Sequence, residues 1–279
     1  MTVEAFRGAV ASTTAAFEAL VQQRAGCDER VSAVVESLIG QLKTSDALLI
    51  SVLSGRRSTT AAHAAVTVSI LSLRIGMELG YSHPELSQLG HVALLHDVTG
   101  AGTPPTRAAL GLVQRIRALG PIYATVADLI VQVHERLEDD VDDERAAPTH
   151  QDAKIVALAV SYDREARQLP TGPRAWPPLP VKAILRRERA RFPDAILKAF
   201  IHISVQFPVG ALVRLNSGEV ARVVAKNDKL PLRPIVQVAP RPGKPGEPRQ
   251  VDLRDNAFVY VLEFLGHAAA DTDTESERT

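Results

Sequence analysis

The sequence predicts a mainly helical protein that closes with a small β module. Apolar residues recur at helical spacing through most of residues 3–205. From Phe207 onward the pattern changes to short apolar runs separated by turn residues. The chain has 279 residues, of which 46% are apolar and 23% charged, as in globular proteins with room for one sizeable domain and a smaller one.

Residues 1–44 predict two helices. Their apolar positions run from Phe6 to Val21 and from Val31 to Leu42, with a break at residues 25–28. Ser45 and Asp46 are suited to cap a short third helix over residues 47–53. Because the apolar stripes of amphipathic helices need burial, the first two helices offer a possible homodimer surface.

The middle of the chain, residues 45–206, predicts a larger helical domain. A long apolar helix spans residues 61–79, begins with Ser58 or Thr59 as its cap, and carries His63 near its start. Ser82 caps a second helix, which ends at His96-Asp97 before a Thr-Gly-Ala-Gly turn. Further helices are expected over residues 106–119, 122–137, 152–167, 181–191 and 194–205.

Two stretches of this region read as loops. The acidic run 138–144 is most simply a solvated surface loop. Residues 170–180 contain five prolines and Trp176, the chain's one tryptophan, and are expected to be extended. Trp176 either covers the core or belongs to a proline-rich partner site.

Residues 207–265 predict the β module. Two runs, 209–215 and 219–224, flank Asn216-Ser217-Gly218 and are typical of a β-hairpin. Further strands are expected at 235–238, 249–253 and 259–262, and the polar tail 266–279 is expected to be disordered.

Composition excludes several classes of protein. Lysine and arginine balance aspartate and glutamate at 32 each, so charge does not indicate a nucleic-acid partner. No uncharged apolar stretch reaches the roughly 18 residues that span a bilayer, and no signal peptide is visible. The expectation is a cytoplasmic protein with no membrane span. With Cys27 as its one cysteine, the chain has no internal disulfide and no thiolate-rich zinc site.

His96-Asp97 is the best candidate for chemistry. An apolar helix that ends in an imidazole and a carboxylate before a glycine-rich turn can form the corner of a metal site. These ligand types suit zinc, iron or manganese. The same dipeptide can equally be a hydrogen-bonded helix end.

The order of these pieces resembles the HD-GYP family, a bacterial branch of the HD-domain phosphohydrolases. The resemblance covers about residues 45–265 and rests on an ordered series of motifs. These are His63-Ala64-Ala65-Val66, Leu94-Leu95-His96-Asp97-Val98, His134-Glu135-Arg136, Ala153–Ala159 with Tyr162-Asp163, and the β stretch 207–220 with Leu232-Arg233-Pro234. The implied fold is an HD-domain-like helical bundle followed by the small β module.

The resemblance also implies a metal site. Family members hydrolyse cyclic di-GMP with two or three metal ions, commonly iron or manganese. Carried over residue by residue, His63, His96, Asp97 and His134 fall on ligand positions. At other positions the residues expected by the resemblance are replaced. Gly100 stands where a lysine is expected, Gly120 and Val133 where histidines are expected, Val160 where an aspartate is expected and Thr59 where an optional glutamate is expected. The Gly-Tyr-Pro signature is also absent.

This ligand set favours a protein without phosphodiesterase activity. A two-metal site needs more ligands than remain. The four residues are predicted to form a vestigial site, either a metal-free polar cluster or the holder of one Fe, Mn or Zn ion, with no catalytic and no cofactor-binding residue. The leading hypothesis is an interaction or regulatory module whose protein partner belongs to cyclic di-GMP signalling. The alternatives are a single-metal phosphohydrolase and a sensor that binds cyclic di-GMP without cleaving it.

Overall fold

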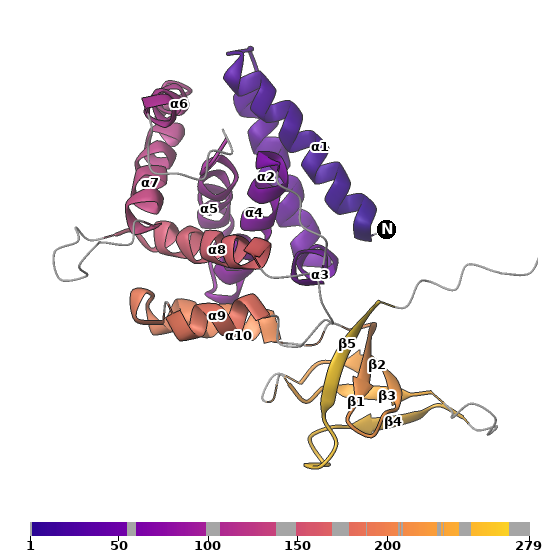
Figure 1. Ribbon diagram of the computed structural model, residues 1–279. Helices are drawn as coiled ribbons and strands as arrows, with labels where there is room; N and C mark the ends of the chain where they lie inside the picture. Colours follow the sequence, from indigo (N-terminus) through magenta and orange to yellow (C-terminus); the bar gives the residue numbers. More distant parts are fainter. Residues whose placement is uncertain are drawn as a thin grey trace, which may run out of the picture. The chain divides into compact units, whose positions relative to one another are not determined.

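A computed structural model describes residues 2–54, 60–98, 107–137, 149–168, 179–187, 189–205, 207, 209–227, 230, 232–239 and 247–267. It confirms the predicted fold class: helices followed by a five-stranded antiparallel sheet (Figure 1). The chain divides into two compact units: the helical unit, made of Met1–Pro170 with Pro180–Ile203, and the sheet unit, made of Thr171–Leu179 with Ser204–Thr279. None of the described helices is both long and apolar enough to cross a membrane.

The helices follow the predicted order closely. In the described part of the chain they are α1 (Thr2–Val21), α2 (Cys27–Thr44), α3 (Ala47–Ser54), α4 (Ala61–Glu78), α5 (His83–Leu95), α6 (Arg107–Arg117), α7 (Pro121–Leu137), α8 (Gln151–Gln168), α9 (Leu179–Arg187), the short 3₁₀ helix η1 (Arg189–Arg191) and α10 (Asp194–Val205).

Helices α4 and α5 form the centre of the helical unit. Almost every side chain of α4 from Ala62 to Ile75 is buried, and α4 packs against α1, α2, α3, α5 and α8. Helix α4 is apolar on nearly all of its sides, and such a helix is stable when other elements cover it on all sides. Helix α5 packs in turn on α2, α4, α7 and α8, so its C-terminal end lies among several helices.

Capping residues explain where two helices begin, and one of the two was predicted correctly. The backbone N–H and the hydroxyl of Ser82 both donate to the Glu85 carboxylate, at 2.7 and 2.6 Å, and fix the start of α5. At α4 the cap is Thr60 rather than Ser58 or Thr59, because the Thr60 hydroxyl accepts from the His63 backbone N–H at 3.3 Å.

The sheet has the strand order β4-β3-β2-β1-β5. Its strands are β1 (Ala211–Leu215), β2 (Val220–Ala225), β3 (Ile235–Val238), β4 (Arg249–Asp252) and β5 (Val261–His267). The hairpin β1–β2 closes through the predicted Asn-Ser-Gly turn, where Gly218 adopts a φ of 83°. Alternate residues of β1 and β2 face a core of their own that includes Phe207, Val236 and Phe264.

One strand prediction was wrong in its position. Residues 259–262 were expected as the last strand, whereas β5 runs from Val261 to His267. Side-chain hydrogen bonds hold residues 256–260 as a loop, so apolar alternation in this stretch reflects packing of a loop and not only of a strand.

Several expectations lie outside the described residues. They concern Thr59, Gly100, the acidic run 138–144, the proline-rich stretch with Trp176 and most of the C-terminal tail.

Candidate functional site

His96 sits at the buried C-terminal end of α5. Its Nδ1 lies 2.8 Å from the Ala93 carbonyl oxygen, which can only accept, so Nδ1 carries the proton. Burial lowers the pKa of His96; His134 acts in the same direction, whereas the Ala93 carbonyl, Asp97 and Asp163 oppose the shift. The ring is therefore neutral at pH 7, with its lone pair on Nε2.

His134 reaches the same place from α7. Its Nε2 donates to the backbone carbonyl of His96 at 2.8 Å. This carbonyl is among the last at the end of α5, which have no partner within their own helix. His134 therefore caps α5, and this bond leaves only its Nδ1 as a possible metal-binding nitrogen.

His63 makes its ring contact elsewhere. Near the start of α4, its imidazole packs edge-on against Phe6 of α1, with ring centroids 5.0 Å apart. The N-terminal helix thus lies against the residue that the resemblance takes as the first ligand. The sequence pattern of residues 1–44 gave no sign of this contact.

At three positions where the resemblance expects a ligand, the chain has a valine or a glycine. Val133 and Val160 are buried in the core. Gly120 has a φ of 146° just before α7, a conformation that side-chain-bearing residues rarely adopt. A histidine at position 120 would therefore be strained in this fold.

Asp163 and Arg136 are both buried near this end of the bundle and both have structural contacts. Asp163, one turn after Val160 on α8, pairs with Arg167. The Arg136 guanidinium lies 5.9 Å from the centroid of the Phe192 ring, and the Arg136 carbonyl accepts from Arg191. These contacts stabilise charged groups in the core.

The structure thus brings His96, Asp97 and His134 into one neighbourhood and places His63 against α1. Within the described ranges, no three His, Cys, Asp or Glu side chains converge in a way that could hold a metal ion. Val133, Val160 and Gly120 have no side-chain donor atoms at the positions where the resemblance expects ligands of a two-metal site. The residues present therefore do not fit a two-metal centre.

A buried polar link, not predicted from the sequence, joins α2, α5 and α7. The Ser32 hydroxyl lies 3.0 Å from Nε2 of His91 and 3.3 Å from the Tyr123 hydroxyl, which donates to the Asp28 carbonyl at 3.0 Å. His91 Nδ1 donates to the Ser87 carbonyl at 2.7 Å, so Ser32 donates to its Nε2 when the ring is neutral. Both ring nitrogens of His91 therefore have hydrogen-bond partners, and burial lowers the pKa of the ring.

A second link centres on Asp152 at the start of α8. Its two carboxylate oxygens accept from the Tyr81 hydroxyl at 3.0 Å and from Gln88 Nε2 at 2.8 Å. Burial, together with the nearby Asp152 charge, raises the pKa of Tyr81. The link joins the segment after α4, the middle of α5 and the start of α8. It depends on the packing of these helices and has no signal in the sequence.

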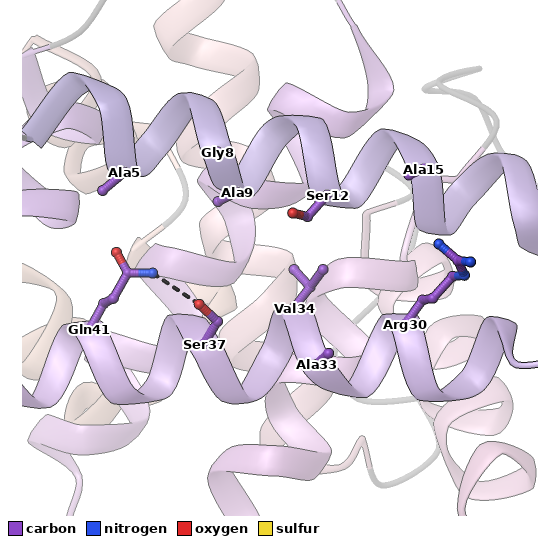
Figure 2. Close-up of a pocket in the computed structure, with 10 residues that line it drawn as sticks. All are labelled: Ala5, Gly8, Ala9, Ser12, Ala15, Arg30, Ala33, Val34, Ser37 and Gln41. Carbon is purple, nitrogen blue, oxygen red and sulfur yellow. Dashed lines mark hydrogen bonds between the residues drawn. The ribbon is translucent and has the colours of Figure 1, made fainter.

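A groove opens between α1 and α2, away from all four candidate ligands. Its volume is about 470 Å³, and Figure 2 shows small side chains of α1, such as Ala5, Ala9 and Ser12, facing Val34, Ser37 and Gln41 of α2. Along α2, Gln41 donates to the Ser37 hydroxyl at 3.1 Å. None of His63, His96, Asp97 and His134 lines the groove.

Comparison with known proteins bears on the sheet unit. Residues 212–269 match the family model described as the KOW domain associated with HD domain. None of the curated proteins and none of the solved structures compared with the chain matches it. The match links the chain to HD-domain proteins, the wider group to which the ordered histidine motifs of residues 63–136 also point.

Proposed function

We propose that this chain is a degenerate HD-GYP-like protein without phosphodiesterase activity, which acts as an interaction or regulatory module in bacterial cyclic di-GMP signalling. Three observations support this proposal. The motifs occur in the expected order, the helices form a bundle around α4 and α5, and the model of the KOW domain associated with HD domain matches the C-terminal sheet. In this proposal the helices of residues 1–44 provide a dimer surface, residues 45–206 the HD-like bundle and residues 207–265 the β module.

The observation that carries the proposal is the hydrogen bonding of His134. Its Nε2 donates to the backbone of His96 and caps α5. Val133 and Val160, at positions where the resemblance expects metal ligands, are buried and carry isopropyl groups. In this arrangement His134 stabilises the bundle as a helix cap, and the valines stabilise it by packing in the core.

A single-metal phosphohydrolase is the second candidate, and the tautomer of His96 favours it. A metal-binding histidine commonly donates one ring N–H to a backbone carbonyl and presents the other nitrogen to the metal. His96 has this arrangement, with Nδ1–H on Ala93 and a lone pair on Nε2. Asp97, the next residue, would supply the carboxylate.

Metal content and hydrolysis together test these two candidates. The purified chain is incubated without oxygen with Fe²⁺ or Mn²⁺, desalted, and analysed for bound metal and for cleavage of cyclic di-GMP. We expect less than stoichiometric metal and no cleavage. His96→Ala and Asp97→Ala serve as the site variants, and His83→Ala, an exposed change on the same helix, is the control.

The outcomes separate the candidates. Cleavage of cyclic di-GMP at an ordinary enzymatic rate contradicts the proposal. Stoichiometric metal that His96→Ala and Asp97→Ala remove, but His83→Ala retains, favours the phosphohydrolase. Binding of cyclic di-GMP without cleavage, measured by titration calorimetry, indicates a sensor. A defined complex with a diguanylate cyclase, in the absence of metal and nucleotide, supports the interaction module.

A further inference from the structure

Two rows of polar side chains meet where α2 packs on α5. In each row the residues are four apart, so they lie along one face of their helix. A hydroxyl group from α7 joins the two rows. We call the whole set the polar seam; its members are Asp28, Ser32 and Glu36 of α2, His83, Ser87 and His91 of α5, and Tyr123 of α7.

The outer end of the seam is an ion pair in contact with solvent. His83 Nε2 lies 3.1 Å from Glu36 Oε2, and the Ser87 hydroxyl donates to Glu36 Oε1 at 3.1 Å. The side chains of His83 and Glu36 are both roughly half exposed. Solvent screens pairs of this kind, so they contribute little to stability. The outer end therefore does little to hold α2 in place.

The inner end of the seam is buried, and its hydrogen bonds depend on the charge of His91. In the neutral ring, Nδ1 donates to the Ser87 carbonyl and Nε2 accepts from the Ser32 hydroxyl at 3.0 Å. The Tyr123 hydroxyl uses its own proton on the Asp28 carbonyl at 3.0 Å. Every donor of the inner end then has an acceptor.

A second proton on the ring reverses one of these bonds. Nε2 then donates to Ser32, and the Ser32 proton has to turn to the Tyr123 oxygen, which lies 3.3 Å away. Pairs of hydroxyl groups prefer about 2.7–2.8 Å, so the rearranged link is weaker. It also holds a buried charge. Burial accordingly lowers the pKa of His91, although the Ser87 carbonyl and the Glu36 charge oppose the shift.

The groups around His91 offer its proton little compensation. Glu36 acts on it from α2 but is already bonded to His83 and Ser87. Tyr123 faces it from α7, and burial raises the pKa of this phenol, so it stays neutral in acid. Other charged groups of the helices that pack on α5 have partners away from His91: Arg74 with Asp46, Glu78 with His202, Asp128 with Arg117, Asp152 with Gln88 and Asp163 with Arg167.

The start of α2 relies on the inner end of the seam. Its N-cap residue, Gly26, has a φ of 72° and makes no side-chain hydrogen bond to the first turn. Such a bond normally stabilises the beginning of a helix. The bonds of the Asp28 carbonyl to Tyr123 and of Ser32 to His91 hold the first turns instead.

The rest of α2 is held differently. Its later turns carry a row of buried apolar side chains, which pack into the bundle: Val34, Val35, Leu38, Ile39 and Leu42. This packing does not involve a titratable group. A change of charge at His91 therefore acts on the beginning of α2 and not on its later turns.

We propose that the polar seam is a pH-sensitive contact: protonation of His91 releases residues 27–32, the first turns of α2, from α5 and α7 while the bundle stays folded. In the open form the His91 ring is hydrated and recovers its ordinary pKa of 6.5. The open form therefore binds protons more readily than the closed form, and opening is favoured as pH falls below 6.5. One histidine can change this equilibrium by at most about tenfold at pH 5.5.

This device is independent of the candidate metal site and of the proposed function. The hydrogen bonds and the ion pair of the seam involve none of His63, His96, Asp97 and His134.

Cys27 reports the opening in the full chain, because it is the chain's one cysteine and is buried at the first position of α2. Its reaction with 4,4′-dithiodipyridine, a thiol reagent that works in mild acid, is timed for the folded chain and for the urea-unfolded chain at pH 7.5 and pH 5.5. The ratio of the two rates is the protection of Cys27, in which the pH dependence of the thiol itself cancels. We expect protection to fall by about three- to tenfold at pH 5.5.

Three variants test the role of His91. His91→Gln keeps a side chain that donates and accepts but does not titrate, so its protection should change by less than about twofold. Glu36→Gln removes the charge that favours protonated His91 and should enlarge the fall in protection. His202→Gln is the matched control: its histidine pairs with Glu78 of α4 and not with α2, so this variant should behave like the wild type.

The urea dependence of the Cys27 rate separates local opening from global unfolding, because a local opening exposes less surface and responds less to urea. Three results would overturn the proposal: constant protection in the wild type, an undiminished fall in His91→Gln, or a Cys27 rate that follows global unfolding at both pH values. Circular dichroism checks the fold of each variant. If His91→Gln does not fold, Glu36→Gln decides, since an unchanged or smaller fall in that variant contradicts the proposal.

Discussion

At the scale of single residues, three histidines of the helical unit share one kind of contact. His91, His96 and His134 each donate to a backbone carbonyl. A buried imidazole is stable when its N–H groups have acceptors and its ring is neutral. The candidate site and the polar link of Ser32, His91 and Tyr123 therefore contribute to stability by the same mechanism.

This mechanism predicts a loss of stability in mild acid. Burial depresses the pKa of folded His91 below its ordinary value of 6.5. Below pH 6.5 the unfolded chain therefore binds more protons than the folded chain, and the free energy of unfolding falls as pH falls towards the folded pKa. His96 acts in the same direction. Urea unfolding at pH 7.5 and at pH 5 measures the difference.

Two variants isolate the contribution of His91. His91→Phe removes the titrating ring and should make the free energy of unfolding less dependent on pH. Tyr123→Phe removes one hydroxyl from the same link, so it should cost roughly 1 kcal/mol at both pH values while keeping the pH dependence. An unchanged pH dependence in His91→Phe would contradict the assignment.

At the scale of elements, the close approach of α5 to α2 and α4 depends on glycine. A Cβ built on Gly90 would lie 2.5 Å from Cγ1 of Val35 and 3.4 Å from Cδ2 of Leu73. Val35 is fully buried and β-branched, so its side chain cannot rotate away. Where α5 passes α2, only a residue without a side chain fits.

Gly90→Ala should therefore destabilise the helical unit by about 1–3 kcal/mol, the usual cost of overpacking a core. Gly8→Ala is the matched control, since a Cβ at this position of α1 would meet nothing within 4 Å. The higher helix propensity of alanine should stabilise this variant by about 0.5–1 kcal/mol. Thermal unfolding of the two variants should move in opposite directions, and a stabilised Gly90→Ala protein would show that α5 does not pack this closely.

At the scale of the whole molecule, each unit has its own core. Residues of all five strands pack with Phe207 in the sheet unit, and α4 fills the centre of the helical unit. A unit with its own hydrophobic core can fold without the rest of the chain.

The segment 204–279 is therefore predicted to fold alone. Its two-dimensional ¹H–¹⁵N spectrum should show dispersed amide signals that overlay those of the same residues in the full chain. Val236→Asp should abolish this dispersion, because it places a charge in the centre of the core. A collapsed spectrum for the unaltered segment would mean that the sheet unit needs the helices to fold.

The order and type of the elements could be predicted from the sequence, because the apolar periods of helix and strand are local properties. The sequence also located the hairpin at Asn216–Gly218, the cap at Ser82 and the break before α2 within a residue or two. The predicted last strand lies too early, because hydrogen bonds with Arg233 and Asn216, 26 and 44 residues away along the chain, keep residues 256–260 as a loop.

The contacts of the candidate ligands depend on tertiary packing. The motifs predicted His63, His96, Asp97 and His134 as candidate ligands. The hydrogen bonds of their ring nitrogens depend on contacts between helices that are distant along the chain. The bond from His134 to the His96 carbonyl spans 38 residues, and the contact of His63 with Phe6 requires α1 to lie on α4. Burial and hydrogen-bond partners arise from packing, and packing is not a property of any single stretch of sequence.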